Sequence, residues 1–275
     1  MAECTITNLA SCIPEKFFEF IVKILNEPVQ PLLDLNKDLM TKPVNIEIFA
    51  QPWAIIIYIL SLFYGLLLLY VGFRFLISGH SPEQREKAKS TLVNVMIMMV
   101  LVQVSFFLYS LILEVIASLS TAVFNMIDKS FFLITIDNLA NLGLEILFLV
   151  PYVAVLVCTL ILLVLRYICV SAGVIFFALG IFFYFIEPLN SYGRLILNGL
   201  LTLISLPFFY SIIFLASSKL LDIDTFENFK ILLMIGAFAL VILGTLILIL
   251  FVIIKAASSV AGPINQVVSV VSSVT

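Results

Sequence analysis

The chain has 275 residues, of which 63% are apolar and 11% are charged, and its formal net charge is −3. Its mean hydropathy is +1.24. A water-soluble domain is about half apolar and a quarter charged, so this composition excludes an ordinary soluble protein and indicates an integral membrane protein. Lys and Arg are nowhere dense enough for a broad nucleic-acid-binding surface.

Residues 1–52 form an amphipathic N-terminal segment that we expect on the extracytoplasmic side. The apolar spacing predicts two short helices, at 14–25 and 31–40. Both are too short to cross a bilayer, so we expect them to lie in the interface plane. Packing on the outer face of the protein itself or on a neighbouring subunit is an open alternative. Cys4 and Cys12 of this segment would form a disulfide in an oxidising exterior, or stay as two unpaired thiols.

Residues 53–254 form the transmembrane domain, for which we predict an all-α, polytopic fold. An apolar helix of about 20 residues crosses the hydrocarbon core, and lipid leaves only helices or closed barrels to satisfy backbone groups. Six stretches qualify, at 53–77, 92–114, 142–166, 168–186, 195–220 and 231–254. A seventh helix, or a re-entrant fourth segment, would move the C-terminus to the other side. We assign no structure to the small-residue tail 255–275.

The hinge between the first two spans is the most patterned polar stretch. Ser81 suits a helix N-cap, Pro82 the first helical position, and Glu83 the first turn. The helical pattern that starts there continues to residue 124. At 1.5 Å per residue, a helix over 82–124 is about 65 Å long, which exceeds one bilayer. We therefore expect this helix to project from the membrane.

The basic residues predict the topology. Six spans place both termini on one side, and the loops of the opposite side carry Arg74, Arg85, Lys87, Lys89, Arg166, Lys219 and Lys230. The side of the termini carries fewer basic residues near the membrane. Because positive charge is retained in the cytoplasm, we expect the N-terminus outside and, with six spans, the C-terminus outside.

Four polar residues in or beside the spans are candidates for function, since ionisable and polar groups are costly in lipid. With a span ending at 114, Glu114 is expected at the outer interface rather than in a buried site. Arg166 is expected to extend to the cytoplasmic boundary. Gln103 and Asn198 are expected to be hydrogen-bond partners between helices.

The catalytic motifs that we considered are absent from the sequence. The one histidine, His80, lies in the hinge, and neither a Gly-x-Ser-x-Gly nor a Gly-Lys-Ser/Thr motif occurs. We therefore expect no enzyme activity, no cofactor and no metal site. Energy for any transport would come from another subunit or from an ion gradient.

The hinge resembles that of the polytopic membrane components of type IV secretion and conjugation systems (the TrbL class). The residues that carry the resemblance are Gly72, Arg74, Ser78, Gly79, Pro82, Glu83, Ala88 and Lys89. Size, span count and Ile/Leu-rich composition are most similar to the polytopic subunits of crenarchaeal DNA-exchange (Ced) systems.

The resemblance implies a channel or platform subunit for DNA import in the cell membrane of an archaeon. It also implies small two-helix membrane partner subunits, a separate hexameric HerA-like ATPase, DNA as the transported cargo, and a homo- or hetero-oligomer in membrane lipid. Under this hypothesis Arg85, Lys87 and Lys89 contact the ATPase, anionic lipid or DNA phosphate. The alternative is a positive-inside cluster that only orients the second span. Two other functions stay open: a secondary transporter or small-solute channel, and a structural platform for a surface pilus.

Overall fold

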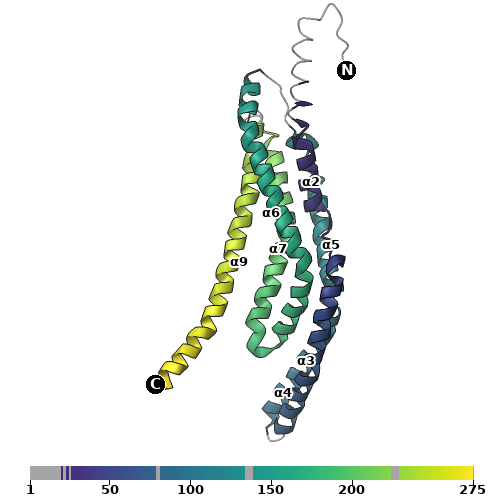
Figure 1. Cartoon of the computed structure of the whole chain (residues 1–275), viewed down its shortest axis with the longest axis vertical. Coiled ribbons are helices and arrows are strands. Elements are labelled where there is room, and N and C mark those ends of the chain that lie inside the picture. Colours follow the sequence, from purple (N-terminus) through teal and green to yellow (C-terminus); the bar gives the residue numbers. More distant parts are fainter. Residues whose placement is uncertain are drawn as a thin grey trace, which may run out of the picture. The chain divides into compact units, whose positions relative to one another are not determined.

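The computed structural model describes residues 20, 23–24, 26–78, 81–133, 139–223 and 229–274, without the side chains of 129–130, 139–146 and 256–274. The regular structure in these ranges is helical, as predicted. The main helices are α2 (Val29–Thr41), α3 (Ala50–Ile77), α4 (Pro82–Gln103), α5 (Ser105–Phe124), α6 (Leu139–Phe185), α7 (Asn190–Leu220) and α9 (Lys230–Val274) (Figure 1). Cys4 and Cys12 lie outside the described residues, as does most of the predicted helix at 14–25.

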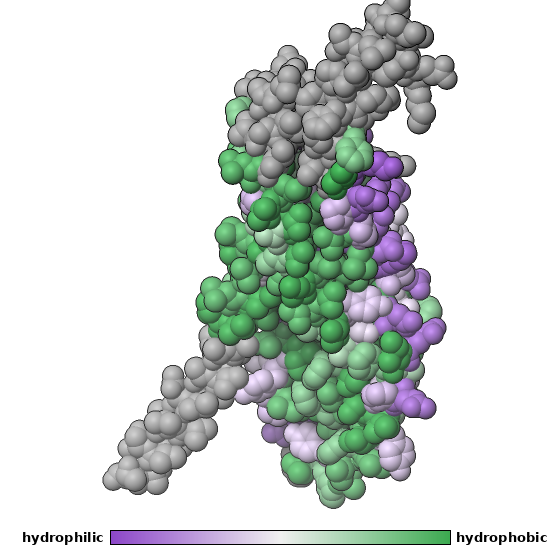
Figure 2. Space-filling view, turned by 45° about the horizontal axis from the view of Figure 1, so that its top comes forward, coloured by the Kyte–Doolittle hydropathy of each residue, from purple (hydrophilic) through white to green (hydrophobic). Residues whose placement is uncertain are grey.

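Five stretches of the described chain are long and apolar enough to cross a membrane: Glu47–Ile77, Ser105–Phe124, Leu147–Phe185, Glu187–Leu220 and Lys230–Lys255. Their exposed surface is largely apolar (Figure 2), which is the surface that a lipid environment requires. These stretches make the chain a multi-pass membrane protein.

The prediction of separate spans at 142–166 and 168–186 is wrong, because α6 runs through both without a break. The sequence suggested a turn at Arg166 and Tyr167, two polar side chains between apolar runs. Both side chains are instead accommodated by contacts with other segments, so the backbone has no reason to leave the helix.

The predicted long helix over 82–124 is nearly continuous. Its one interruption is Val104, between α4 and α5, where the helical bonds from Val104 N–H to the Val100 carbonyl and from Leu108 N–H to the Val104 carbonyl persist. Of the two helices, α5 is by itself long and apolar enough to cross a membrane, over Ser105–Phe124. The charges at the start of α4 leave too short an apolar length in that helix for a crossing.

At the C-terminal end, the tail that we left without structure continues α9 to Val274. At the N-terminal end, the helix α2 covers the stretch 31–40. Its buried face consists of Val29, Asn36 and Met40, and the Thr121 hydroxyl donates to the Thr41 carbonyl over 3.0 Å. The helix thus packs on the protein itself, which was one of the two open alternatives.

The chain divides into two compact units. The first comprises 1–42, 117–165 and 207–245, and its core is a group of aromatic side chains centred on Phe132. That ring lies 5.6 Å from the ring of Phe214 and 6.3 Å from that of Phe238. The Tyr152 hydroxyl donates to the Phe132 carbonyl over 3.0 Å and fixes the loop that carries this ring.

The second unit comprises 43–116, 166–206 and 246–275. In it α3 and α4 form an antiparallel hairpin (Figure 1), with Ile57, Leu60, Val95 and Met98 in a shared apolar cluster. Near the start of α3, the indole of Trp53 donates to the Ser105 hydroxyl over 3.0 Å. A second apolar cluster joins 44–46 to α5, α6 and α7.

Candidate functional site

The hinge between α3 and α4 is a tight turn whose described residues are partly as predicted. Pro82 is the first residue of α4 and Ser81 is its N-cap, but the Ser81 side chain makes no capping bond. The backbone N–H of Ser81 donates instead to the Ser78 carbonyl over 3.3 Å. Ser78 is buried and donates its hydroxyl to the Phe75 carbonyl. Gly79 and His80 lie outside the described residues.

The predicted contact residues divide into a packed one and an exposed group. Ala88 is fully buried, and its small side chain lets α4 pack closely. Glu83 and Lys87 form an exposed ion pair at 2.8 Å, one helical turn apart, which by itself contributes little to stability. Arg85 and Lys89 are also exposed. The hairpin therefore presents three basic side chains where the first turns of α4 leave the apolar region.

Arg166 is a buried and hydrogen-bonded polar residue of the second unit. The residue is only 7% exposed. Its Nε donates to the Leu203 carbonyl over 2.9 Å, and a terminal nitrogen donates to the Ile204 carbonyl over 3.3 Å. The expectation that Arg166 extends to a membrane boundary is wrong. Its position inside a continuous helix brings it instead against the backbone of α7.

The reason that α7 accepts these bonds is in its own sequence. Pro207 lies inside α7 and has no N–H, so it cannot donate to the carbonyl four residues before it, which belongs to Leu203. A buried carbonyl without a donor costs about 1–3 kcal/mol. Arg166 supplies the missing donor, and this bond joins α6 to α7 where the helical hydrogen bond of α7 is missing.

Two tyrosines extend the polar contacts around Arg166. The Tyr109 hydroxyl donates to the Val170 carbonyl over 2.6 Å. The Tyr167 hydroxyl accepts the backbone N–H of Asn45 at 3.0 Å, and the Ser171 hydroxyl donates to the Asn45 carbonyl at 2.7 Å. The segment before α3 is therefore held to α6 through both polar groups of one peptide residue.

Sequence reasoning missed Tyr109, Tyr167 and Asn45, because tyrosines in an apolar run are indistinguishable from ordinary core aromatics. One signal was available: a proline inside a predicted span predicts an open carbonyl, and the arginine of the preceding span is the obvious donor.

The remaining candidates lie apart from this network. Gln103 is exposed and approaches the Tyr64 hydroxyl of α3 without reaching hydrogen-bond geometry. Asn198 is also exposed. Glu114 is exposed and accepts a long bond of 3.4 Å from the Ser110 hydroxyl. Its expected interfacial position depended on a span ending at 114, whereas in the stretch Ser105–Phe124 it lies near the middle.

Comparisons with known proteins add no relative. The chain matches no family model, no curated protein and no solved structure.

Proposed function

We propose that the chain is a membrane-embedded subunit of a conjugation-like DNA import apparatus, driven by a separate ATPase. The resemblance of the hinge supplies the DNA-import part of this proposal. The geometry supports the other part, that the chain works inside a larger membrane assembly.

The supporting observation is the apolar length of α6. The stretch Leu147–Phe185 has 39 residues, which at 1.5 Å per residue is about 58 Å of helix. The hydrocarbon core is only about 30 Å thick. Even a strongly tilted helix would leave apolar turns beyond the lipid.

α6 exposes large apolar side chains from Leu147 to Phe176, among them Val150, Ile161 and Ile168. An exposed apolar surface is one that lipid or another protein covers, and lipid covers only about 30 Å of this length. A multi-subunit assembly would cover the part of α6 that lipid cannot reach, as the proposed two-helix partners would. A secondary transporter working alone offers no such cover.

The basic side chains Arg85, Lys87 and Lys89 support a cytoplasmic position for the α3–α4 turn. Five crossings would then put the N-terminal segment outside and residues after Lys255 inside. This differs from the expectation for six spans, in which both termini share one side. The three cations face the compartment in which an ATPase and incoming DNA would be met.

The function is tested by DNA transfer between genetically marked cells. We expect a deletion strain to lose transfer and the complemented strain to recover it. Unchanged transfer on deletion would rule out the DNA-import function. In that case, solute flux through the purified chain in liposomes would test the transporter alternative.

The contact role is tested by the triple variant Arg85→Gln, Lys87→Gln and Lys89→Gln. Its matched control, Lys42→Gln, Lys219→Gln and Lys230→Gln, removes the same charge from the side that we assign to the exterior. We expect transfer to fall in the first variant and not in the second, with both chains present in the membrane at equal amounts. Equal transfer would leave the cluster with only an orienting role.

The assembly is tested independently by mass measurement of the chain extracted from its native membrane in a mild detergent. We expect a complex heavier than the 30.7 kDa of one chain. A monomer under several detergents would contradict the interpretation of the α6 surface.

A further inference from the structure

The first unit contains a cavity of about 390 Å³, between α2, the segment 124–133 and the helices α7 and α9. This volume falls within the usual range of about 300–1,000 Å³ for small-molecule sites. None of its lining residues belongs to the hinge or to the Arg166 network. The inference drawn from it does not depend on the proposed function.

One wall of the cavity is aromatic. Phe124 stacks on Phe132 with ring centroids 5.7 Å apart and planes 4° apart. Phe214 and Phe238 continue this wall with centroids 4.7 Å apart, and both are buried. Such a wall favours an apolar or aromatic body over a polar one.

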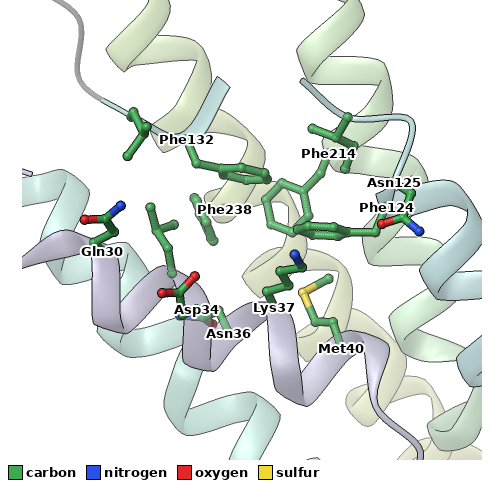
Figure 3. A pocket seen from close by; sticks show the side chains of 13 residues that line it. Gln30, Asp34, Asn36, Lys37, Met40, Phe124, Asn125, Phe132, Phe214 and Phe238 are labelled. Carbon is green, nitrogen blue, oxygen red and sulfur yellow. The ribbon is translucent and has the colours of Figure 1, made fainter. Parts of the chain in front are cut away.

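The opposite wall is polar and comes from one face of α2. Figure 3 shows Gln30, Asp34 and Lys37 extending from this helix on the side of the four phenylalanines. Asp34 and Lys37 are both exposed, and the described residues make no ion pair within 4.0 Å with Asp34. The ammonium of Lys37 lies 5.8 Å from the centre of the Phe124 ring.

Asn36 adds a buried polar group to the lining. Its side chain is 3% exposed, and its amide nitrogen donates to the Leu32 carbonyl over 2.8 Å. Its Oδ1 accepts no hydrogen bond from the described residues. Leaving a buried acceptor without a donor is unfavourable, so this atom favours a ligand that brings an N–H or O–H.

We propose that this cavity binds a zwitterionic amphiphile, with an ammonium and an acidic group beside an apolar body. The ammonium would meet the Asp34 carboxylate, the acidic group the Lys37 ammonium, and the apolar body the four phenylalanines. A hydrocarbon would leave the charges of Asp34 and Lys37 without partners, and a simple anion would pair with Lys37 but be repelled by Asp34. Only a ligand with both charges and an apolar part complements all three surfaces.

Two sources carry this chemistry: an apolar α-amino acid in solution and a phospholipid with a zwitterionic headgroup. The experiment uses the purified full chain in neutral detergent and radiolabelled L-phenylalanine as the soluble probe. Competitors are 3-phenylpropanoic acid, which lacks the ammonium, and 2-phenylethylamine, which lacks the carboxylate. The lipid arm uses nanodiscs doped with a photoreactive phosphatidylethanolamine, whose ammonium carries N–H groups, or with a photoreactive phosphatidylglycerol of the same chains.

In the soluble arm we expect each one-charge analogue to compete about tenfold more weakly than L-phenylalanine itself, the effect of one charge-assisted contact. In the lipid arm we expect labelling of the segment 124–133 by phosphatidylethanolamine and about tenfold less by phosphatidylglycerol. A positive result in either arm identifies the source. If phenylalanine does not bind and the lipid labelling does not depend on the headgroup, the proposal is overturned.

The variant Asp34→Asn, Lys37→Gln is the test in the protein. Its matched control is Asp38→Asn, Lys42→Gln, which removes an exposed ion pair of the same helix that does not line the cavity. We expect the first variant to lose about tenfold in the arm that binds and the second to keep its binding, with thermal unfolding measured to show that both fold. If both variants lose binding equally, or if neither loses any, the ligand binds elsewhere on the detergent-exposed surface and the proposed site is overturned.

Discussion

Arg166 of α6 donates to the carbonyl of Leu203 in α7 over 2.9 Å, and this carbonyl is the one that Pro207 leaves without its helical donor. The bond explains how an arginine is accommodated inside a helix that is otherwise almost entirely apolar. It also explains how α7 continues through an internal proline.

The first prediction is a coupling between these two positions. Arg166→Met should lower the free energy of unfolding by about 1–3 kcal/mol, since a buried carbonyl loses its donor. In a Pro207→Ala background the new N–H of residue 207 can serve Leu203, so the same substitution should cost less. The measurement is a double-mutant cycle by reversible unfolding in mixed micelles. Additive effects would show that Arg166 does not substitute for the missing N–H.

The exposed Arg194 is the control for this cycle. Its guanidinium lies 5.9 Å from the Tyr184 ring, and Arg194→Met should change stability by less than about 1 kcal/mol. It should show no coupling to Pro207→Ala.

The second prediction concerns the close approach of α6 to α5 and α7 at Gly173. A Cβ at this position would overlap the Tyr109 hydroxyl and lie 2.8 Å from Leu200 Cδ2. Because Tyr109 is fully buried and hydrogen-bonded, the ring cannot move aside easily. Gly173→Ala should therefore destabilise the chain by about 1–3 kcal/mol.

Gly244→Ala is the matched control, because a Cβ there would have nothing within 4 Å. It should be neutral or stabilising by up to about 1 kcal/mol, the helix-propensity gain. Thermal unfolding of both variants in one detergent gives the comparison. Equal effects would contradict the close packing at Gly173.

The third prediction concerns the segment before α3. Tyr167→Phe removes the oxygen that accepts the Asn45 N–H, so hydrogen exchange at that amide should speed up by about fivefold. The measurement is exchange followed by mass spectrometry. Tyr58→Phe, which alters an exposed tyrosine of α3, should leave the Asn45 amide unchanged. Similar protection in both variants would mean that Ser171 alone holds the segment.

The fourth prediction is the topology. Single reporters inserted after Lys89 and after Lys255 should report the same side, and a reporter after Asp128 the opposite side. This outcome follows from the proposed topology, in which five crossings separate the two sides and Arg85, Lys87 and Lys89 are retained in the cytoplasm. Opposite signals from the first two positions would restore a sixth crossing within the stretch that α6 occupies.

The apolar helices were predicted well from the sequence. The break predicted between 142–166 and 168–186 was wrong, because α6 is continuous there. Composition is enough to place α3 or α9, because a run of 20 or more apolar residues is typical of a transmembrane helix. Composition could not place Arg166. A charged residue stays inside an apolar helix only when the folded protein offers it a hydrogen-bond partner, and otherwise it marks the end of a membrane span. That partner, the Leu203 carbonyl, is 37 residues away.

The aromatic cavity was beyond prediction for the same reason. Its lining comes from four separate segments, of which only α2 was predicted to be amphipathic. The buried Asn36 was unexpected, because a helix predicted from apolar spacing should bury its leucines, whereas Leu35 is 47% exposed and Asn36 is 3% exposed.

The two bonds at Asn45 have a consequence for the order of folding within the second unit. Tyr167 and Ser171 of α6 hold the N–H and the carbonyl of Asn45, from which they are separated by 122 and 126 residues. Closing so long a loop costs chain entropy before the contact repays it. The segment before α3 should therefore dock onto α6 late, after α6 itself has formed.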